Sequence, residues 1–120
     1  MKRDMDLIRE ILIKIEEHED GRAPNVIVVD GYTEDQIYHH IYLMGQANLL
    51  EVSDYTTIDS KSPVAMPYSM TWKGHDFLDA IRSDKIWEKT KRKIKEAGGS
   101  MPYKIVKTIA IAIIKKQVGL

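Results

Sequence analysis

The signals for one helix constrain the fold of this chain more than any other feature. Thr33 and Gln36 have the spacing of a capping box, in which the Thr33 side chain accepts from the backbone of Gln36 and Gln36 reaches back. Apolar residues then recur at helical spacing up to Asn48. Because Asn tolerates the left-handed conformation that often follows a helix, the sequence predicts a helix over residues 33–47.

A hairpin is predicted directly after this helix. Residues 49–55 and 64–70 have the composition of short strands, and the polar segment 56–63 joins them. Pro67 cannot donate to a strand ladder, so the second strand is expected at an edge or bulged at that residue.

The remaining periodicity predicts further elements on both sides of this hairpin. We expect a helix over residues 4–18, a buried strand over 25–29, and three C-terminal helices capped by Thr71, Asp84 and Ser100. The order is α-β-α-β-β-α-α-α, which belongs to the α+β class. One domain is predicted over residues 1–120, with 84–120 as a C-terminal helical extension. Its expected core contains Ile8, Leu12, Ile37, Ile41, Met44 and Phe77.

Composition limits the function classes. The 120 residues include no Cys, which excludes disulfides and thiolate metal sites. The apolar run 109–114 is far shorter than the roughly 20 residues of a membrane span, so a soluble, cytoplasmic protein is expected. Residues 1–60 carry 5 Lys and Arg against 13 Asp and Glu, and residues 61–120 carry 13 against 5. This polarity favours either head-to-tail self-association or an anionic partner.

No catalytic or metal-binding pattern stands out. The chain contains no phosphate-binding loop, dinucleotide fingerprint or nucleophile elbow. His39 and His40 are adjacent and point about 100° apart on a helix, so a shared metal ion is not expected. His75 and Asp79 have helical spacing, but packing or solvation accounts for such a pair more simply. We therefore predict no enzyme, no cofactor and no metal.

A basic segment supplies the candidate nucleic-acid-binding residues. They are Lys85, Lys89, Lys91, Arg92, Lys93 and Lys95, with Glu88 as the one acid among them. The segment is consistent with a solvated helix face and with an anion-binding face that Lys107, Lys115 and Lys116 extend. Trp72, Trp87 and Tyr103 are expected in the core, because no basic residues are interleaved with them.

The helix over residues 33–47 carries a different set of candidates. It has no Lys or Arg, and Glu34 and Asp35 stand at its start, which makes it a poor reader of DNA. Four of its polar side chains are candidate contacts to a protein partner: Gln36, His39, Tyr42 and Gln46.

The chain also resembles known proteins. Residues 47–50, the hairpin and residues 70–74 resemble the winged-helix pattern, with Asn48 in the position of a Gly and residues 40–44 on the would-be recognition helix. Residues 1–9, 31–34, 38–41, 71–82, 87–91 and 98–99 together resemble a family of small bacterial and prophage proteins of unknown function, built on a winged helix. The resemblance implies that fold and brings no activity. One departure is that no positioning helix precedes residue 33, which argues against standard major-groove docking.

Two functions remain open at this point. The first is a nucleic-acid-associated regulatory module that uses its basic C-terminal helix. The second is a protein–protein interaction module without DNA binding. The last helix is apolar on more than one side, so it either closes the core or forms a homodimer.

Overall fold

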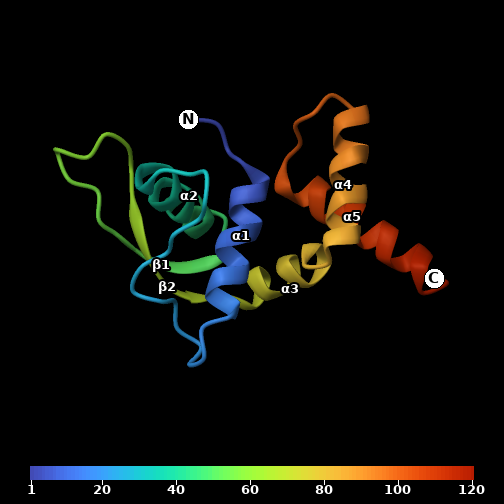
Figure 1. The fold of residues 1–120 in the computed structure, drawn as a ribbon, viewed down its shortest axis with the longest axis horizontal. Coiled ribbons are helices and arrows are strands. Elements are labelled where there is room, and N and C mark those ends of the chain that lie inside the picture. Colours follow the sequence, from blue (N-terminus) through green and yellow to red (C-terminus); the bar gives the residue numbers. More distant parts are fainter. The chain divides into compact units, whose positions relative to one another are not determined.

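The computed structural model describes residues 1–120 and confirms the α+β class, with five helices and one two-stranded antiparallel hairpin (Figure 1). The elements are α1 (Met5–Glu16), α2 (Glu34–Gln46), β1 (Leu50–Asp54), β2 (Ala65–Met70), α3 (Trp72–Ile81), α4 (Asp84–Glu96) and α5 (Tyr103–Gln117). They form two compact units, Met1–His75 and Asp76–Leu120, and the boundary falls inside α3. No helix has both the length and the apolar character needed to cross a membrane.

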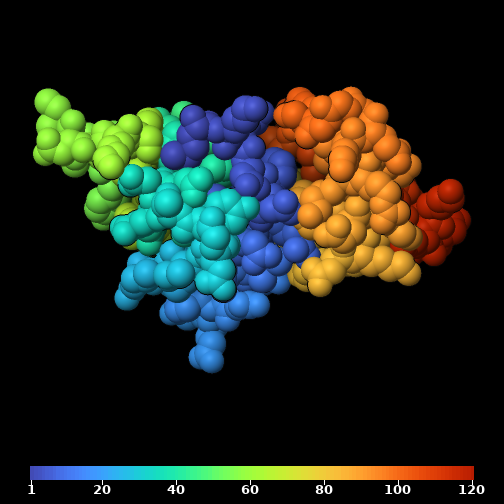
Figure 2. Space-filling model, turned by 45° about the horizontal axis from the view of Figure 1, so that its top comes forward, coloured from blue at the N-terminus to red at the C-terminus, as the bar shows by residue number.

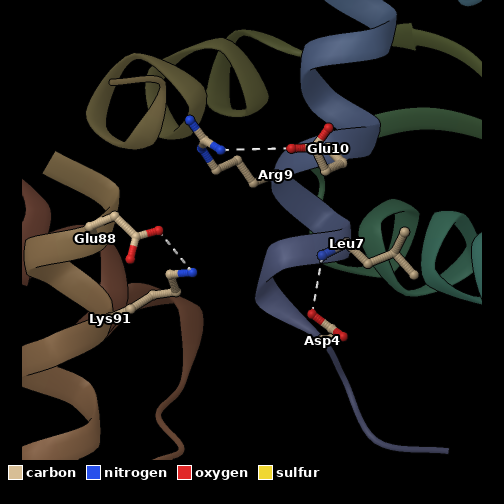
Figure 3. A network of polar contacts seen from close by, with 6 residues as sticks. All are labelled: Asp4, Leu7, Arg9, Glu10, Glu88 and Lys91. Carbon is tan, nitrogen blue, oxygen red and sulfur yellow. Dashed lines mark hydrogen bonds and ion pairs between the residues drawn. The ribbon is translucent and has the colours of Figure 1, made fainter. Parts of the chain in front are cut away.

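Helix α1 begins at the expected cap and ends early. The backbone N–H of Leu7 donates to Oδ1 of Asp4 over 3.1 Å (Figure 3). The apolar stripe is buried, and its members are Leu7, Ile8, Ile11, Leu12 and Ile15. The helix ends at Glu16, two residues before the predicted end. Acidic residues crowd this end, where the helix dipole disfavours negative charge.

The prediction of a strand over residues 25–29 is wrong. Ile27 and Val29 are buried, whereas Val26 and Val28 are 68% and 65% exposed, which is the alternation of an extended chain. No strand pairs with this segment, however, because the only sheet consists of β1 and β2. The β-branched composition therefore predicted the extended backbone correctly but wrongly predicted that it pairs with another strand. The first unit has the order α-α-β-β.

Helix α2 has the predicted ends and packs against α1 and both strands. Both capping-box bonds form: Gln36 N donates to Oγ1 of Thr33 over 3.1 Å, and Thr33 N donates to Oε1 of Gln36 over 2.8 Å. Asn48 has a φ of 60°, the left-handed conformation expected after the helix. Ile37, Ile41 and Met44 are buried as predicted.

The hairpin confirms the irregularity at Pro67. Leu50 lies opposite Met70 and Asp54 opposite Ala65, but the register shifts between Glu51 and Val52 and leaves Tyr68 unpaired beside Pro67. Both strands are edges, since the sheet has no third strand. The loop between them projects from the end of the hairpin (Figures 1 and 2).

In the second unit, α4 packs against α5, and two predicted caps are corrected. Ser83, not Asp84, caps α4, because its Oγ accepts from Ile86 N over 3.3 Å and places Asp84 in the first turn. Ser100 lies outside α5, whose N-cap is Pro102. The residue before a proline is disfavoured in the helical conformation, which stops the helix from starting earlier.

The three aromatic residues expected in the core differ in how far they are buried. Trp87 is buried, and the ring of Tyr103 meets that of Phe77 edge-on at 5.7 Å. Trp72, by contrast, is 84% exposed, so its predicted burial is wrong. The buried face of α3 contains Phe77, Leu78 and Ile81, and helical geometry puts Trp72 on the opposite face.

Candidate functional site

A groove between α4 and α5 lies wholly within the second unit and collects basic side chains. Its volume is about 780 Å³. It is lined by Lys89, Arg92, Lys93 and Glu96 of α4 and by Ile109, Ala112, Ile113, Lys116 and Gln117 of α5. Ile113 is buried, whereas Arg92, Lys93 and Lys116 are exposed. The groove therefore has an apolar floor and a largely cationic rim.

The six residues predicted to bind nucleic acid divide between two flanks of α4. Successive residues of a helix turn by about 100°. One flank carries Lys85, Lys89, Arg92 and Lys93, of which the last three line the groove. Lys91 and Lys95 fall on the other flank. There, Nζ of Lys91 lies 3.2 Å from Oε1 of Glu88 (Figure 3) and 5.8 Å from the centre of the Trp87 ring. Lys91 is thus already engaged within α4.

The charges around the groove have no ion-pair partners within the chain. None of the four cations, Lys89, Arg92, Lys93 and Lys116, forms a salt bridge, and neither does Glu96. Lys89 has like-charged neighbours three and four residues along the helix, an arrangement that costs about 0.2–0.5 kcal/mol per pair. Lys93 and Lys116 lie in the last turns of α4 and α5, where the helix dipole favours positive charge, but no ion pair offsets the repulsion around Lys89.

Helix α5 contributes one predicted cation, Lys116, and three apolar residues that the sequence did not assign to the site, whereas Lys107 and Lys115 do not line the groove. Ile109, Ala112 and Ile113 supply the floor, and Lys116 completes the rim from the opposite side. The sequence signal was the spacing of Ile109, Ile113 and Lys116, which puts them on one helix face. Ile105 lies one turn before Ile109 on the same face, does not line the groove and is 45% exposed.

The predicted partner surface on α2 is partly occupied by internal contacts. Gln36 is committed to the capping box. Nδ1 of His39 contacts the carbonyl oxygen of Pro63 at 2.7 Å, and its ring stacks on Tyr42 at 6.2 Å. Nε2 of Gln46 donates to the Tyr42 hydroxyl over 3.4 Å. The four side chains therefore lie on α2 as expected, but His39 is tied to the end of the hairpin loop.

His40 belongs to a buried network that the sequence did not indicate. Its Nε2 accepts from Asp4 N over 2.9 Å, and its Nδ1 donates to the carbonyl oxygen of Gln36 over 2.8 Å. Only the neutral ring with its proton on Nδ1 can make both bonds. The Tyr32 hydroxyl donates to Oδ2 of Asp4 over 2.8 Å, and burial together with this carboxylate raises the pKa of Tyr32 to about 12.

This network predicts that the protein loses stability in mild acid. Burial lowers the pKa of His40 below its ordinary value of 6.5, so the unfolded chain binds more protons than the folded chain. The free energy of unfolding should be highest above about pH 6.5, fall as the pH drops below that value, and level off below the folded pKa. Each unit by which the pKa is lowered corresponds to about 1.4 kcal/mol.

Urea denaturation at about pH 7.5 and about pH 5.5 measures this loss. His40→Gln should show a smaller difference between the two pH values than the unchanged protein, because it cannot take up the proton. His75→Gln, at an exposed position, should keep the full difference. Equal losses in the unchanged protein and in His40→Gln would show that His40 does not titrate in this way.

No metal centre emerges from the side chains. The rings of His39 and His40 lie 6.3 Å apart and nearly perpendicular, and no group of three or more His, Cys, Asp or Glu residues is arranged to hold an ion.

The fold and the groove define a small α+β protein with a cationic surface groove. The chain belongs to the family described as "Hypothetical protein (DUF2513)", whose model matches residues 2–100. It is 34% identical over 122 residues to an "Uncharacterized protein" from Haemophilus influenzae, and the match covers 99% of this chain and 100% of that protein. No solved structure matches. The expected membership of a family of unknown function is thereby confirmed.

Proposed function

We propose that this protein is a non-catalytic nucleic-acid-binding module that holds the phosphate backbone in the groove between α4 and α5. The observation that carries the proposal is the cluster of four cations around that groove without ion-pair partners. Phosphate neutralisation supplies most of the affinity of non-specific nucleic-acid binding, so a cluster of this kind suffices for it. The long apolar stems of Lys and Arg would rest on Ile109 and Ile113 while their charged ends reach the phosphates.

A winged-helix identity for the first unit agrees with this function and is part of the proposal. α1, α2 and the hairpin follow one another in the order of that fold. The positioning helix, which would lie between α1 and α2, is absent. In the usual docking mode α2 would enter the major groove. It has no cation, however, and Glu34 and Asp35 stand at the end that would meet the bases. We therefore assign nucleic-acid contact to α4 and α5.

The proposal predicts binding that is weakly sequence-specific and strongly salt-dependent. If the groove neutralises about three phosphates, log K should fall with log salt at a slope of about −2.7. That slope corresponds to about a 40-fold loss of affinity between roughly 50 and 200 mM salt. Fluorescence polarisation with a labelled duplex of random sequence measures it, and Arg92→Glu with Lys93→Glu should abolish binding at both salt concentrations.

A matched control distinguishes binding in the groove from attraction by the net charge of the protein. Lys91→Glu with Lys95→Glu changes the charge of α4 by the same amount on the opposite flank and should keep most of the affinity. His39→Ala with Gln46→Ala should also leave it largely intact. Equal losses in the two α4 variants, or no binding by the unchanged protein at low salt, would refute the proposal.

A further inference from the structure

A second groove lies wholly within the first unit and differs in character from the cationic one. Its volume is about 650 Å³. Its walls are residues 25–28, the start of α2 and the loop end of the hairpin. Most of the lining is apolar or aromatic, including Val26, Val28, Ile37, Tyr38, Tyr55, Val64, Ala65 and Met66. Two of the valines and Tyr55 are exposed, at 68%, 65% and 60%. The groove is therefore an open apolar surface.

The backbone along this groove has unused hydrogen-bonding capacity. Ala23 N donates to the carbonyl oxygen of Tyr68 over 2.8 Å, so the segment starts beside β2. Further along, Val26 and Val28 have no hydrogen-bond partner within the chain, and Ile27 N reaches only the Tyr38 hydroxyl, at 3.4 Å. The edge of β2 that does not face β1 has no strand beside it. The groove is thus bordered by an extended segment with unpaired backbone groups at Val26 and Val28 and by a strand with no neighbour on its outer edge, which is the setting for strand addition.

The charge of the groove indicates what kind of segment it accepts. Its charged lining residues are Glu34 and Asp35, both exposed and neither in an ion pair. The unit around it is acidic as well, since residues 1–75 contain 7 Lys and Arg against 13 Asp and Glu, a net charge of −6. We propose that this groove binds an extended segment of another protein in which Lys or Arg alternates with apolar residues. The apolar side chains face Ile37 and Tyr38, the cations meet the two carboxylates, and the peptide backbone pairs with the unused groups.

A fluorescent peptide in which Lys and Val alternate tests this proposal on the full-length protein. We expect saturable binding, with NMR shifts concentrated on the amides of Val26, Val28, Ala65 and Met66. Glu34→Gln with Asp35→Asn should weaken binding about tenfold at low ionic strength. Glu17→Gln with Glu19→Gln removes the same charge from exposed positions outside the groove and should leave affinity within about twofold.

Peptide variants separate strand addition from simple charge attraction. A peptide of the same sequence with alternate backbone nitrogens methylated keeps its charge but cannot pair on both edges, and it should lose most of its affinity. Equal binding by that peptide, equal weakening by the two carboxylate variants, or no binding at low salt would overturn the proposal. Sedimentation showing that the protein alone dimerises, and that Glu34→Gln with Asp35→Asn makes it monomeric, would assign the groove to a second copy instead.

Discussion

Replacing Gly74 with alanine should remove most of the stability of the first unit. Gly74 lies in the first turn of α3 and is buried. A Cβ at this position would clash with the carbonyl oxygen of Leu49 and would lie 2.7 Å from Cγ of Met70. The carbonyl cannot move aside, because it accepts from Thr71 N over 3.1 Å. We expect a loss of about 4 kcal/mol or more, which is most of the stability of a small domain.

The hydrogen bonds of Thr71 explain why the clash at Gly74 cannot relax. Oγ1 of Thr71 donates to the carbonyl oxygen of Asn48 over 2.6 Å and accepts from Gly74 N over 3.0 Å. These bonds tie the end of α2 to the start of α3 through a single side chain. Moving α3 away to admit a methyl group would break them.

Urea denaturation followed by far-ultraviolet circular dichroism measures the effect, and Gly45→Ala provides the control. There, an added Cβ would meet only the side chain of Val52, which is half-buried and can be shortened. Gly45→Ala should cost less than Gly74→Ala, and adding Val52→Ala should restore much of the loss. If the free energy of unfolding of Gly74→Ala lay within about 1 kcal/mol of that of the unchanged protein, the start of α3 would be able to move away from the carbonyl of Leu49.

Local rules predicted the helices well, since their signals act over a few residues. The capping box at Thr33, the cap at Asp4 and the left-handed Asn48 all appear in the structure. Residues 25–29 show where such rules fail. Their composition determines that the backbone is extended, but pairing depends on whether another strand lies alongside. None does, so the groove of the first unit could not be foreseen from these residues.

The cationic site was predicted as a list of residues but not as a surface. Counting charges treated Lys89 and Lys91 alike, although Lys91 is held by Glu88 and Trp87 on the opposite flank. Distinguishing them requires the orientation of α4, which the buried Ile86, Thr90 and Ile94 define. Lys116 was expected to extend this face together with Lys107 and Lys115, but only Lys116 lines the groove, because the packing of α5 against α4 selects one face of α5.

Placing a carboxylate at Val106 should detach α5 and unfold the second unit. Val106 is fully buried on α5, and α4 is the element that packs against this helix. An aspartate there has no cationic partner among the buried residues of α4, which are Ile86, Trp87, Thr90 and Ile94. A buried, unpaired carboxylate costs several kcal/mol, so we expect Val106→Asp to destabilise by about 4 kcal/mol or more. Val106→Ala should cost less, about 2–3 kcal/mol, because it leaves a cavity but no charge.

The two tryptophans make this loss measurable by fluorescence. Trp72 is 84% exposed and already meets water, whereas Trp87 is 1% exposed and belongs to α4. A red shift of the emission therefore reports the second unit. If residues 1–120 fold as one domain, the urea transition of Val106→Ala followed by this emission should coincide with the transition of the His40 resonances in the first unit. Two separate transitions would show that the C-terminal helices fold independently, and an unshifted emission in Val106→Asp would show that α4 keeps Trp87 buried without α5.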